Sequence, residues 1–344
     1  MSSESEHDDL TAMVRGMKTV ASPLRAFLAD LQRTFAPLTT GTLSDTFPEL
    51  AKADPNWFGI CLVDTHGRIY EVGDSQRMFT MQSLTNPFVY GLALTELGRD
   101  EVLARVGVEP ASDCFTLSNE PTLPNPLVTA GVLRLMTLLK GSNATERLDN
   151  LLTLFRRLTN REVMVDATVF TAARMLGHRY RALAHFMLDR GLITESVDEV
   201  LDLFFQQQSL LVSCRDLAAM AATLANQGKN PISGEAVIEA PYVRDILSVL
   251  YSCGMRNTAG TWAYQVGLPA ESSVSGAILA VVPQQLGIAV FSPLLNERGH
   301  SVRGLKVCEA LTQHFGLHAF DPAERRAKLQ ESMGVRSGSP LSRL

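Results

Sequence analysis

The chain has 344 residues, of which 46% are hydrophobic and 19% are charged, and these proportions exclude wholesale disorder. Its net charge of −5 comes from scattered residues, so we expect no nucleic-acid partner. The first ten residues lack the basic start and the apolar core of a signal peptide, so we expect none, and no apolar run reaches the roughly 18 residues that cross a bilayer. We therefore expect a cytoplasmic protein with no membrane partner.

Residues 1–9 are acidic and polar, and we expect them to be disordered. Over residues 10–36 apolar side chains recur at helical spacing, which predicts an N-terminal helical arm that Pro23 divides into two helices. The apolar stripe of this arm is a candidate contact with another subunit. Packing of the same stripe onto the protein's own core is at least as good an interpretation.

Residues 58–73 predict two strands joined by a tight turn at "DTHG". Residues 127–226 are helical in pattern, and the last helix has Ser213 as its N-cap and Asp216 in its first turn. Strands are then predicted over residues 261–267, 276–283 and 286–293, followed by a helix over 302–315. The charged and Gly/Ser/Pro-rich tail, residues 321–344, is predicted to be flexible.

Strands near both ends of the chain, with helices between them, predict an α/β fold of the α+β type with an antiparallel sheet. We expect one domain over residues 37–320. Its sheet part is predicted to comprise residues 37–115 and 245–320, and its helical part residues 116–244.

The cysteines show no pairing or metal-binding pattern, since they are odd in number, far apart and never spaced as C-x-x-C. The histidines lack the spacing of zinc ligands as well. We therefore expect reduced, mostly buried thiols, no metal and no cofactor. The cysteines are Cys61, Cys114, Cys214, Cys253 and Cys308.

The stretch "FTMQSLTNPF" has the layout of a turn that carries a nucleophile, because a β-like run ends at Ser83 and a helix follows. Together with eight other segments in the same order, it resembles the serine-dependent glutaminases, relatives of the β-lactamase and penicillin-binding-protein fold. The other segments are "FPELAKADP", "VGVEPASDCF", "LPNPLVTAG", "GHRYRALAHFM", "SLLVSCRDLAAMAATLANQGKNPISGE", "SCGMRNTAG", "YQVGLPAESSVSGAILAVVP" and "SPLLNERGHSVRG".

The resemblance implies an antiparallel sheet flanked by helices, an all-helical part, and hydrolysis of L-glutamine to glutamate and ammonia. It also implies self-association, so the expected partner is a second copy or a related glutaminase. Ser83 keeps the nucleophile position, and Ser83 and Val274 supply the backbone donors of an oxyanion hole. Asn86 stands where the family has its lysine base, and an amide cannot accept the serine proton.

Other positions that the resemblance assigns to substrate binding or proton transfer are also substituted. Phe204 replaces a tyrosine that serves in proton transfer, and Glu271 replaces a lysine at the rim of the cleft. The substituted substrate-binding positions are Thr129, Ala173, Tyr180 and Arg256.

No replacement base is evident, because none of the six lysines lies in the segment around Ser83 and an arginine stays protonated. His300 is the only new titratable candidate, and a hydrogen-bonded or surface position is the commoner role for such a histidine. Ser83 itself has a structural alternative, which is to cap the helix that follows it.

We therefore predict a pseudoenzyme of the glutaminase type that acts by self-assembly or by binding an active glutaminase. One alternative is a working glutaminase, or another serine amidohydrolase, with a non-standard base. A second is a sensor of a small molecule such as an amino acid. In that case Arg256 and Glu271 would suit a zwitterionic ligand, although a salt bridge between them is the simpler expectation.

Overall fold

One antiparallel sheet combines strands from both ends of the described chain. The structure is a computed structural model and describes residues 22–111, 125–322 and 327–334. The strand order is β2-β1-β7-β6-β5, and each neighbouring pair is antiparallel. The strands are β1 (Gly59–Asp64), β2 (Ile69–Gly73), β5 (Ala270–Ser272), β6 (Ala277–Val282) and β7 (Leu286–Phe291).

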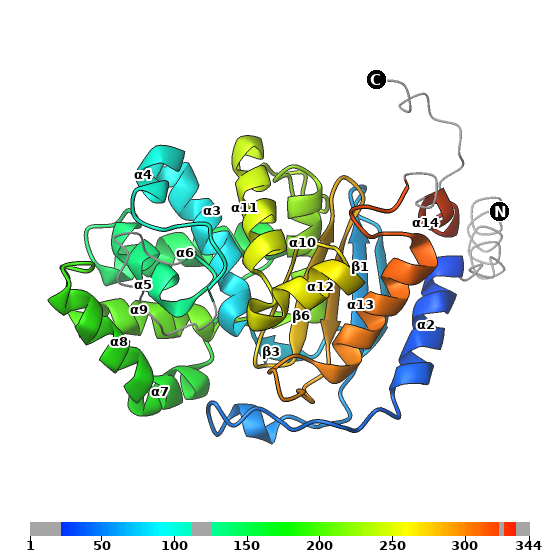
Figure 1. Cartoon of the computed structure of the whole chain (residues 1–344), viewed down its shortest axis with the longest axis horizontal. Coiled ribbons are helices and arrows are strands. Elements are labelled where there is room, and N and C mark those ends of the chain that lie inside the picture. Colours follow the sequence, from blue (N-terminus) through cyan, green and yellow to red (C-terminus); the bar gives the residue numbers. More distant parts are fainter. Residues whose placement is uncertain (1–21, 112–124, 323–326, 335–344) are drawn as a thin grey trace, which may run out of the picture.

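Helices cover both faces of this sheet, so every residue of β1, β6 and β7 is buried. Successive strand residues point to opposite faces. In β1, Cys61 joins the core on the side of α10 (Cys214–Ala225), whereas Ile60 and Leu62 join the core beneath α2 (Pro23–Phe35) and α13 (Val302–Phe315). Figure 1 shows α2 and α13 at one end of the molecule.

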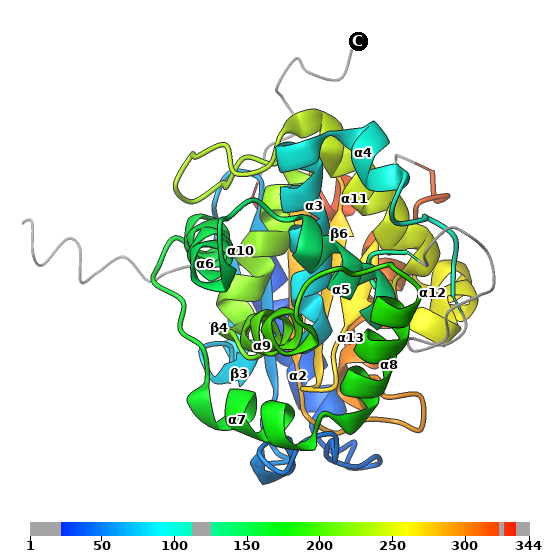
Figure 2. The same cartoon turned by 90° about the vertical axis from the view of Figure 1, so that its left-hand side faces the viewer.

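Helices α3 to α9 form a block that lies on the other side of α10 and α11, as Figures 1 and 2 show. This block includes much of the expected helical part of the chain and also α3, which directly follows Ser83. Besides α2, α10 and α13, the longer helices of the fold are α3 (Asn86–Leu97), α5 (Thr129–Leu138), α6 (Ala144–Thr159), α7 (Ala167–Leu176), α8 (His178–Asp189), α9 (Val197–Gln208) and α11 (Ala240–Cys253). The shorter ones are α4 (Arg99–Leu103), α12 (Ala259–Gln265), α14 (Ala327–Ser332) and the 3-10 turns η1 (Leu50–Lys52), η2 (Gln82–Thr85) and η3 (Arg256–Thr258).

Two sequence predictions at the element level are corrected by the structure. Residues 261–267 were expected to form a strand, but they belong largely to α12. In a strand Trp262, Tyr264 and Val266 would share a face, whereas Trp262 and Val266 are buried and Tyr264 is 86% exposed, a helical i, i+4 pattern. Likewise α10 falls in the expected helical part, yet it packs against the sheet.

The described portion of the arm packs onto its own molecule. Leu24, Leu28 and Leu31 of α2 are buried against the sheet and α13, which is the second interpretation of its apolar stripe. Residues 1–21, and with them the first predicted helix, lie outside the described residues. Within the range predicted as a flexible tail, residues 327–334 include α14, which packs on α2 and α13 with Leu329 buried.

Candidate active site

A short pair of strands from distant parts of the chain places Ser83 at the border between the sheet and the helical block. Strand β3 (Met78–Thr80) pairs with β4 (Leu211–Ser213) and runs directly into the turn η2. Gln82 has a φ of 52°, a strained value for a residue with a side chain, and its amide Nε2 donates to Thr80 Oγ1 at 3.0 Å. Strain held next to a candidate nucleophile is typical of functional turns.

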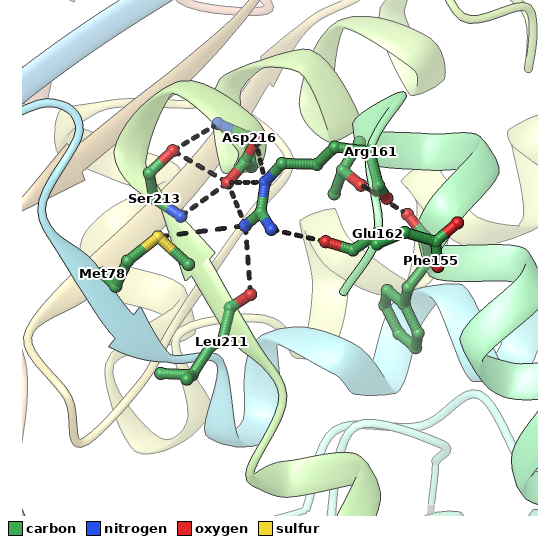
Figure 3. A network of polar contacts seen from close by, with 8 residues as sticks. Met78, Phe155, Arg161, Glu162, Leu211, Ser213 and Asp216 are labelled. Atoms are coloured by element: carbon green, nitrogen blue, oxygen red, sulfur yellow. Dashed lines mark hydrogen bonds and ion pairs between the residues drawn. The ribbon is translucent and has the colours of Figure 1, made fainter. Parts of the chain in front are cut away.

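Arg161, which follows α6 in the helical block, holds the β3–β4 strand pair in place (Figure 3). Its guanidinium bonds both carboxylate oxygens of Asp216, at distances down to 2.6 Å, and the carbonyl of Leu211 in β4 at 3.2 Å. Asp216 and Ser213 form the capping box of α10, so the cap predicted from the sequence is confirmed. The β3–β4 strand pair, whose strand β3 leads into the Ser83 turn, is thereby tied to both halves of the fold.

Ser83 does not cap the following helix, because the N-cap position of α3 belongs to Thr85. Instead the Ser83 hydroxyl donates to the main-chain carbonyl of Ser272 at 3.0 Å, which joins η2 to the free edge of β5. The capping interpretation of Ser83 is therefore wrong. Ser83 is half-buried and faces a cavity of about 340 Å³.

Seven of the nine predicted site positions line this one cavity, although six different segments of the chain supply them. Thr46, Phe47, Gln82 and Gln208 also contribute to the wall. Ala173 and Glu271, each only 1% exposed, do not line it. The seven positions are Ser83, Asn86, Thr129, Tyr180, Phe204, Arg256 and Val274.

A larger hollow of about 670 Å³ lies between α10, α11 and the turn from β6 to β7, and none of the predicted site residues lines it.

Asn86 is the centre of a buried amide network. Its Nδ2 donates to the Leu127 carbonyl at 3.1 Å, and its Oδ1 accepts from Gln208 Nε2 at 3.1 Å and from Gln207 Nε2 at 3.3 Å. Gln207 also donates to the Thr85 hydroxyl. The sequence analysis missed both glutamines, whose only signal was their place in the run "FFQQQ" on α9. Asn86 thus acts as a structural hydrogen-bonding group beside the serine.

Aromatic rings form part of the cavity wall. The ring of Tyr180 lies 5.5 Å from those of Phe204 and Phe205, and the two phenylalanine rings lie 5.6 Å apart. Phe204 is only 3% exposed, so a packed phenylalanine ring occupies the position at which the resemblance implies a tyrosine. This wall gives the cavity an apolar side.

Arg256 and Glu271 do not form the expected salt bridge. Among the described residues no ion pair within 4 Å involves either side chain, and neither carboxylate oxygen of Glu271 has a hydrogen-bond partner. Burial raises the pKa of Glu271 to about 8, although the positive charge of Arg256 lowers it. Arg256 makes one long bond, from Nη2 to the Gly299 carbonyl at 3.4 Å.

His300 is buried and bonds to β5, the strand whose Ser272 carbonyl accepts the hydrogen bond from Ser83. Its Nδ1 shares a hydrogen bond of 2.5 Å with Ser272 Oγ, and its Nε2 one of 2.9 Å with Thr258 Oγ1. Burial, followed by the charges of Arg256 and Arg298, lowers the pKa of His300 to about 4. The ring is therefore neutral near pH 7 and is a hydrogen-bonded structural residue.

The loop that carries Val274 keeps a tight turn despite its serines. Ser273 N–H donates to the Ala277 carbonyl at 3.0 Å, and the hydroxyls of Ser273 and Ser275 lie 2.6 Å apart. Gly276 has a φ of 90°, and a Cβ there would lie 2.4 Å from the Ser292 carbonyl oxygen. The turn holds Val274 at the cavity beside Ser83.

Within residues 22–111, 125–322 and 327–334 no group of three or more His, Cys, Asp or Glu side chains is placed to hold a metal ion. In the same part of the chain no helix is long and apolar enough to pass through a membrane. The four cysteines described there are free and buried, and Cys114 lies outside the described residues.

A family model described as Glutaminase matches residues 41–320. The chain belongs to the glutaminase family. A glutaminase from Trichormus variabilis is 52% identical over 304 residues, which cover 87% of this chain and 91% of the relative. A glutaminase from Microcystis aeruginosa is 46% identical over 330 residues, 95% of this chain and 97% of the relative.

Solved glutaminase-family structures share the fold. The native form of Mglu superposes with a TM-score of 0.84 at 36% identity and covers 88% of this chain and 75% of its own. The Bacillus subtilis glutaminase YbgJ, solved as a covalent complex with 5-oxo-L-norleucine, gives a TM-score of 0.80 at 30% identity over 86% and 99% of the two chains. The predicted family and the predicted β-lactamase-like fold, an antiparallel sheet flanked by helices, are confirmed.

The prediction of a pseudoenzyme is corrected by these relatives. Proteins named glutaminase match at 46% to 52% identity along almost the whole chain, and they favour a working glutaminase. The prediction gave more weight to single substitutions, above all Asn86, than to the family membership of the chain. The comparisons do not test the roles of individual site residues.

Proposed function

We propose that this member of the glutaminase family hydrolyses the side-chain amide of L-glutamine, with Ser83 as the nucleophile. The observation that supports it most directly is the position of Ser83, at a strained turn on a 340 Å³ cavity shared with six further positions implied by the family resemblance. The substrate follows from the relatives, which are named glutaminase. The reaction needs no metal or cofactor.

The proposed reaction has two halves. Ser83 Oγ attacks the amide carbon of glutamine, the resulting oxyanion accepts hydrogen bonds from the main-chain N–H groups of Ser83 and Val274, and the C–N bond breaks. Ammonia leaves with the proton from the serine hydroxyl, and a γ-glutamyl ester remains on Ser83. Water then hydrolyses this ester, releases glutamate and restores the hydroxyl.

The proton acceptor is the non-standard part of this proposal. Asn86 cannot serve, because an amide does not titrate and its oxygen already accepts from Gln207 and Gln208. The present partner of the Ser83 hydroxyl, the Ser272 carbonyl, orients the oxygen without removing its proton. The proposal therefore includes a base other than the lysine of the family.

Thr129, Tyr180 and Arg256 are the polar groups we assign to the amino-acid end of the substrate, because their side chains lie in the cavity wall. Phe204 and the ring of Tyr180 supply its apolar side. Ala173 is buried behind the wall and contributes no carboxylate.

We further propose that the protein is cytoplasmic and self-associates. The mass of the purified chain in solution, measured alone and after co-expression with a related glutaminase, tests assembly. A monomer under both conditions would contradict it.

Ammonia release from L-glutamine by the wild type and by Ser83→Ala tests the reaction. We expect release from the wild type and at least a 1,000-fold lower rate in Ser83→Ala, since a nucleophile is lost. Ser252→Ala, on the exposed side of α11, is the matched control and should retain full activity.

A second measurement is the mass of the intact protein after treatment with 6-diazo-5-oxo-L-norleucine. We expect covalent addition to the wild type with loss of dinitrogen, and no addition to Ser83→Ala. Undetectable ammonia release together with an unlabelled wild type would refute the proposed function.

A further inference from the structure

Arg303 is the largest fully buried side chain among the described residues, with 1% of its surface exposed. Within the same part of the chain, no carboxylate forms an ion pair with it. It lies in the first turn of α13, where the helix dipole disfavours a cation. Burying a guanidinium without an anion also costs free energy. Stability of the helix therefore does not explain why an arginine occupies this position.

The guanidinium of Arg303 closes the base of a long loop. Its Nη2 donates to the Ala36 carbonyl and its Nε to the Leu38 carbonyl, each at 2.9 Å, and both acceptors directly follow α2. Its Nη1 donates to the Pro55 carbonyl at 2.9 Å, shortly before β1 begins. One side chain thus joins the two ends of residues 39–54, which is the geometry of an Ω-loop.

The loop also lies along the segment that leads into α13. In that segment Ser292 Oγ accepts a bond of 3.2 Å from Arg303 Nη1. Thr42 exchanges two main-chain hydrogen bonds with Leu295, at 2.9 and 2.8 Å. Gly41 has a φ of 101°, and a Cβ there would lie 2.5 Å from the Leu295 carbonyl oxygen. The loop is therefore in direct backbone contact with this segment.

The part of the loop beyond this contact reaches the Ser83 cavity. Thr46 and Phe47 line the cavity, and Phe47 is buried in the core. Ser44 Oγ donates to Thr46 Oγ1 at 3.0 Å, which orients the threonine hydroxyl. The bridge at Thr42 and the short turn η1 are the only regular structure within the loop. Long loops of this kind are usually functional.

We propose that Arg303 is a positioning residue for the hydrolysis reaction. By closing the base of the loop, it holds Thr46 and Phe47 in the cavity wall and so sets the affinity for the substrate. Arg303 does not line the cavity and acts only through the loop. A guanidinium suits this task because its fixed plane of five N–H donors can bond three carbonyls at once. The inference rests on the proposed function, which places the substrate in this cavity.

The kinetics of ammonia release from L-glutamine test this role. We expect Arg303→Met to raise KM at least tenfold and to change kcat less than threefold, because a loosened wall weakens substrate binding and leaves Ser83 in place. Arg303→Lys should recover part of the loss, since an ammonium group can still donate to some of the carbonyls. Arg147→Met is the matched control. It removes a largely buried arginine that pairs with Glu195 far from the loop, and it should change KM less than twofold.

Gly41→Ala moves the same loop without changing the guanidinium, and it remains decisive if Arg303→Met does not fold. Its Cβ should displace the loop from Leu295 and raise KM at least fivefold. Hydrogen exchange followed by mass spectrometry provides a readout that needs no turnover. The amides of residues 39–54 should exchange at least fivefold faster in both variants than in the wild type, whereas those of α10 should not change. Circular dichroism verifies that each variant is folded.

A wild-type KM in folded Arg303→Met or in Gly41→Ala would overturn the inference. Unchanged exchange of residues 39–54 would overturn it as well, and so would an equal rise of KM in Arg147→Met. If the wild type neither releases ammonia nor reacts with 6-diazo-5-oxo-L-norleucine, the proposed function fails. Hydrogen exchange alone then decides whether Arg303 holds the loop at the cavity.

Discussion

Asn86 shows how a single side chain can differ in role from the one its position suggests. The sequence identifies the missing base, but only the structure shows that the amide accepts from two glutamine side chains and donates to a carbonyl. These are long-range partners, from 41 to 122 residues away in sequence, and no local pattern reveals them.

Restoring the lysine at this position should destabilise the fold. In Asn86→Lys the Nε2 donors of Gln207 and Gln208 would face an ammonium group, which cannot accept. We expect about 2 kcal/mol lower free energy of unfolding, because buried donors would lose their acceptor. Urea denaturation measures it, and Asn257→Lys, exposed in η3, should change stability by less than about 0.5 kcal/mol. Equal stability of the two variants would show that the amide network contributes nothing.

Glu271 predicts an unusual dependence of stability on pH. Its pKa is raised from 4.5 to about 8 in the folded state, so between these values the unfolded chain releases a proton that the folded protein retains. The free energy of unfolding should therefore fall as pH rises from about 4.5 to 8, by a few kcal/mol from this group. Denaturation of the wild type and Glu271→Gln across this range measures it. The variant should gain stability relative to the wild type as pH rises, and parallel profiles would disprove the assignment.

At the scale of elements, the β3–β4 strand pair depends on a contact from outside it. Three-residue strands are too short to be stable alone, and Arg161 bonds both β4 and the carboxylate that caps α10. We expect Arg161→Gln to lower the free energy of unfolding by about 2 kcal/mol, because Asp216 is almost buried and loses its cation.

The control is Arg157→Gln, which removes a more exposed ion pair with Glu235. That change should cost less than about 1 kcal/mol. Thermal unfolding compares the two variants. If ammonia release proves measurable, Arg161→Gln should also lower kcat, since the β3–β4 strand pair positions Ser83.

Sequence patterns predicted those elements whose burial follows a simple period. The hairpin of β1 and β2, the strands β6 and β7, and the helix over residues 302–315 are all present. Residues 261–267 were misread because Thr261, Trp262, Tyr264 and Val266 favour strands, while tertiary packing of Trp262 and Val266 selects a helix. Local preference was overridden by the core beneath α12.

At the scale of the whole molecule, α10 and the sheet lie in close backbone contact. A Cβ on Gly287 of β7 would lie 2.2 Å from Ala222 N and 2.5 Å from the Ala218 carbonyl oxygen in α10. Gly287→Ala should therefore force the layers apart and cost about 3 kcal/mol or more, as overpacking does. Calorimetric melting should show a fall in Tm of several degrees.

Gly260→Ala provides the comparison, since no heavy atom lies within 4 Å of a Cβ there and the residue is in α12. That variant should be neutral or stabilised by about 0.5 to 1 kcal/mol, because alanine favours helices. Similar melting of both variants would show that the layers are not tightly packed.

The order of the strands could not be read from the sequence. Hairpins predict only the pairs of neighbours along the chain, whereas β1 pairs with β7 across more than 220 residues. The site could not be read from the sequence for the same reason. Its walls come from distant segments, which are brought together when β1 pairs with β7. The family resemblance supplied this arrangement where local patterns did not.

This sheet has a consequence for how the protein is made. A ribosome releases β1 and β2 long before it has synthesised β5, β6 and β7. Until then, the edge of β1 that pairs with β7 is unpaired, and the face of α10 that packs on the sheet lacks its contacts with β6 and β7. A nascent chain that ends before Ala270 should therefore be prone to aggregate or to recruit chaperones, and the final 75 residues decide when the fold closes.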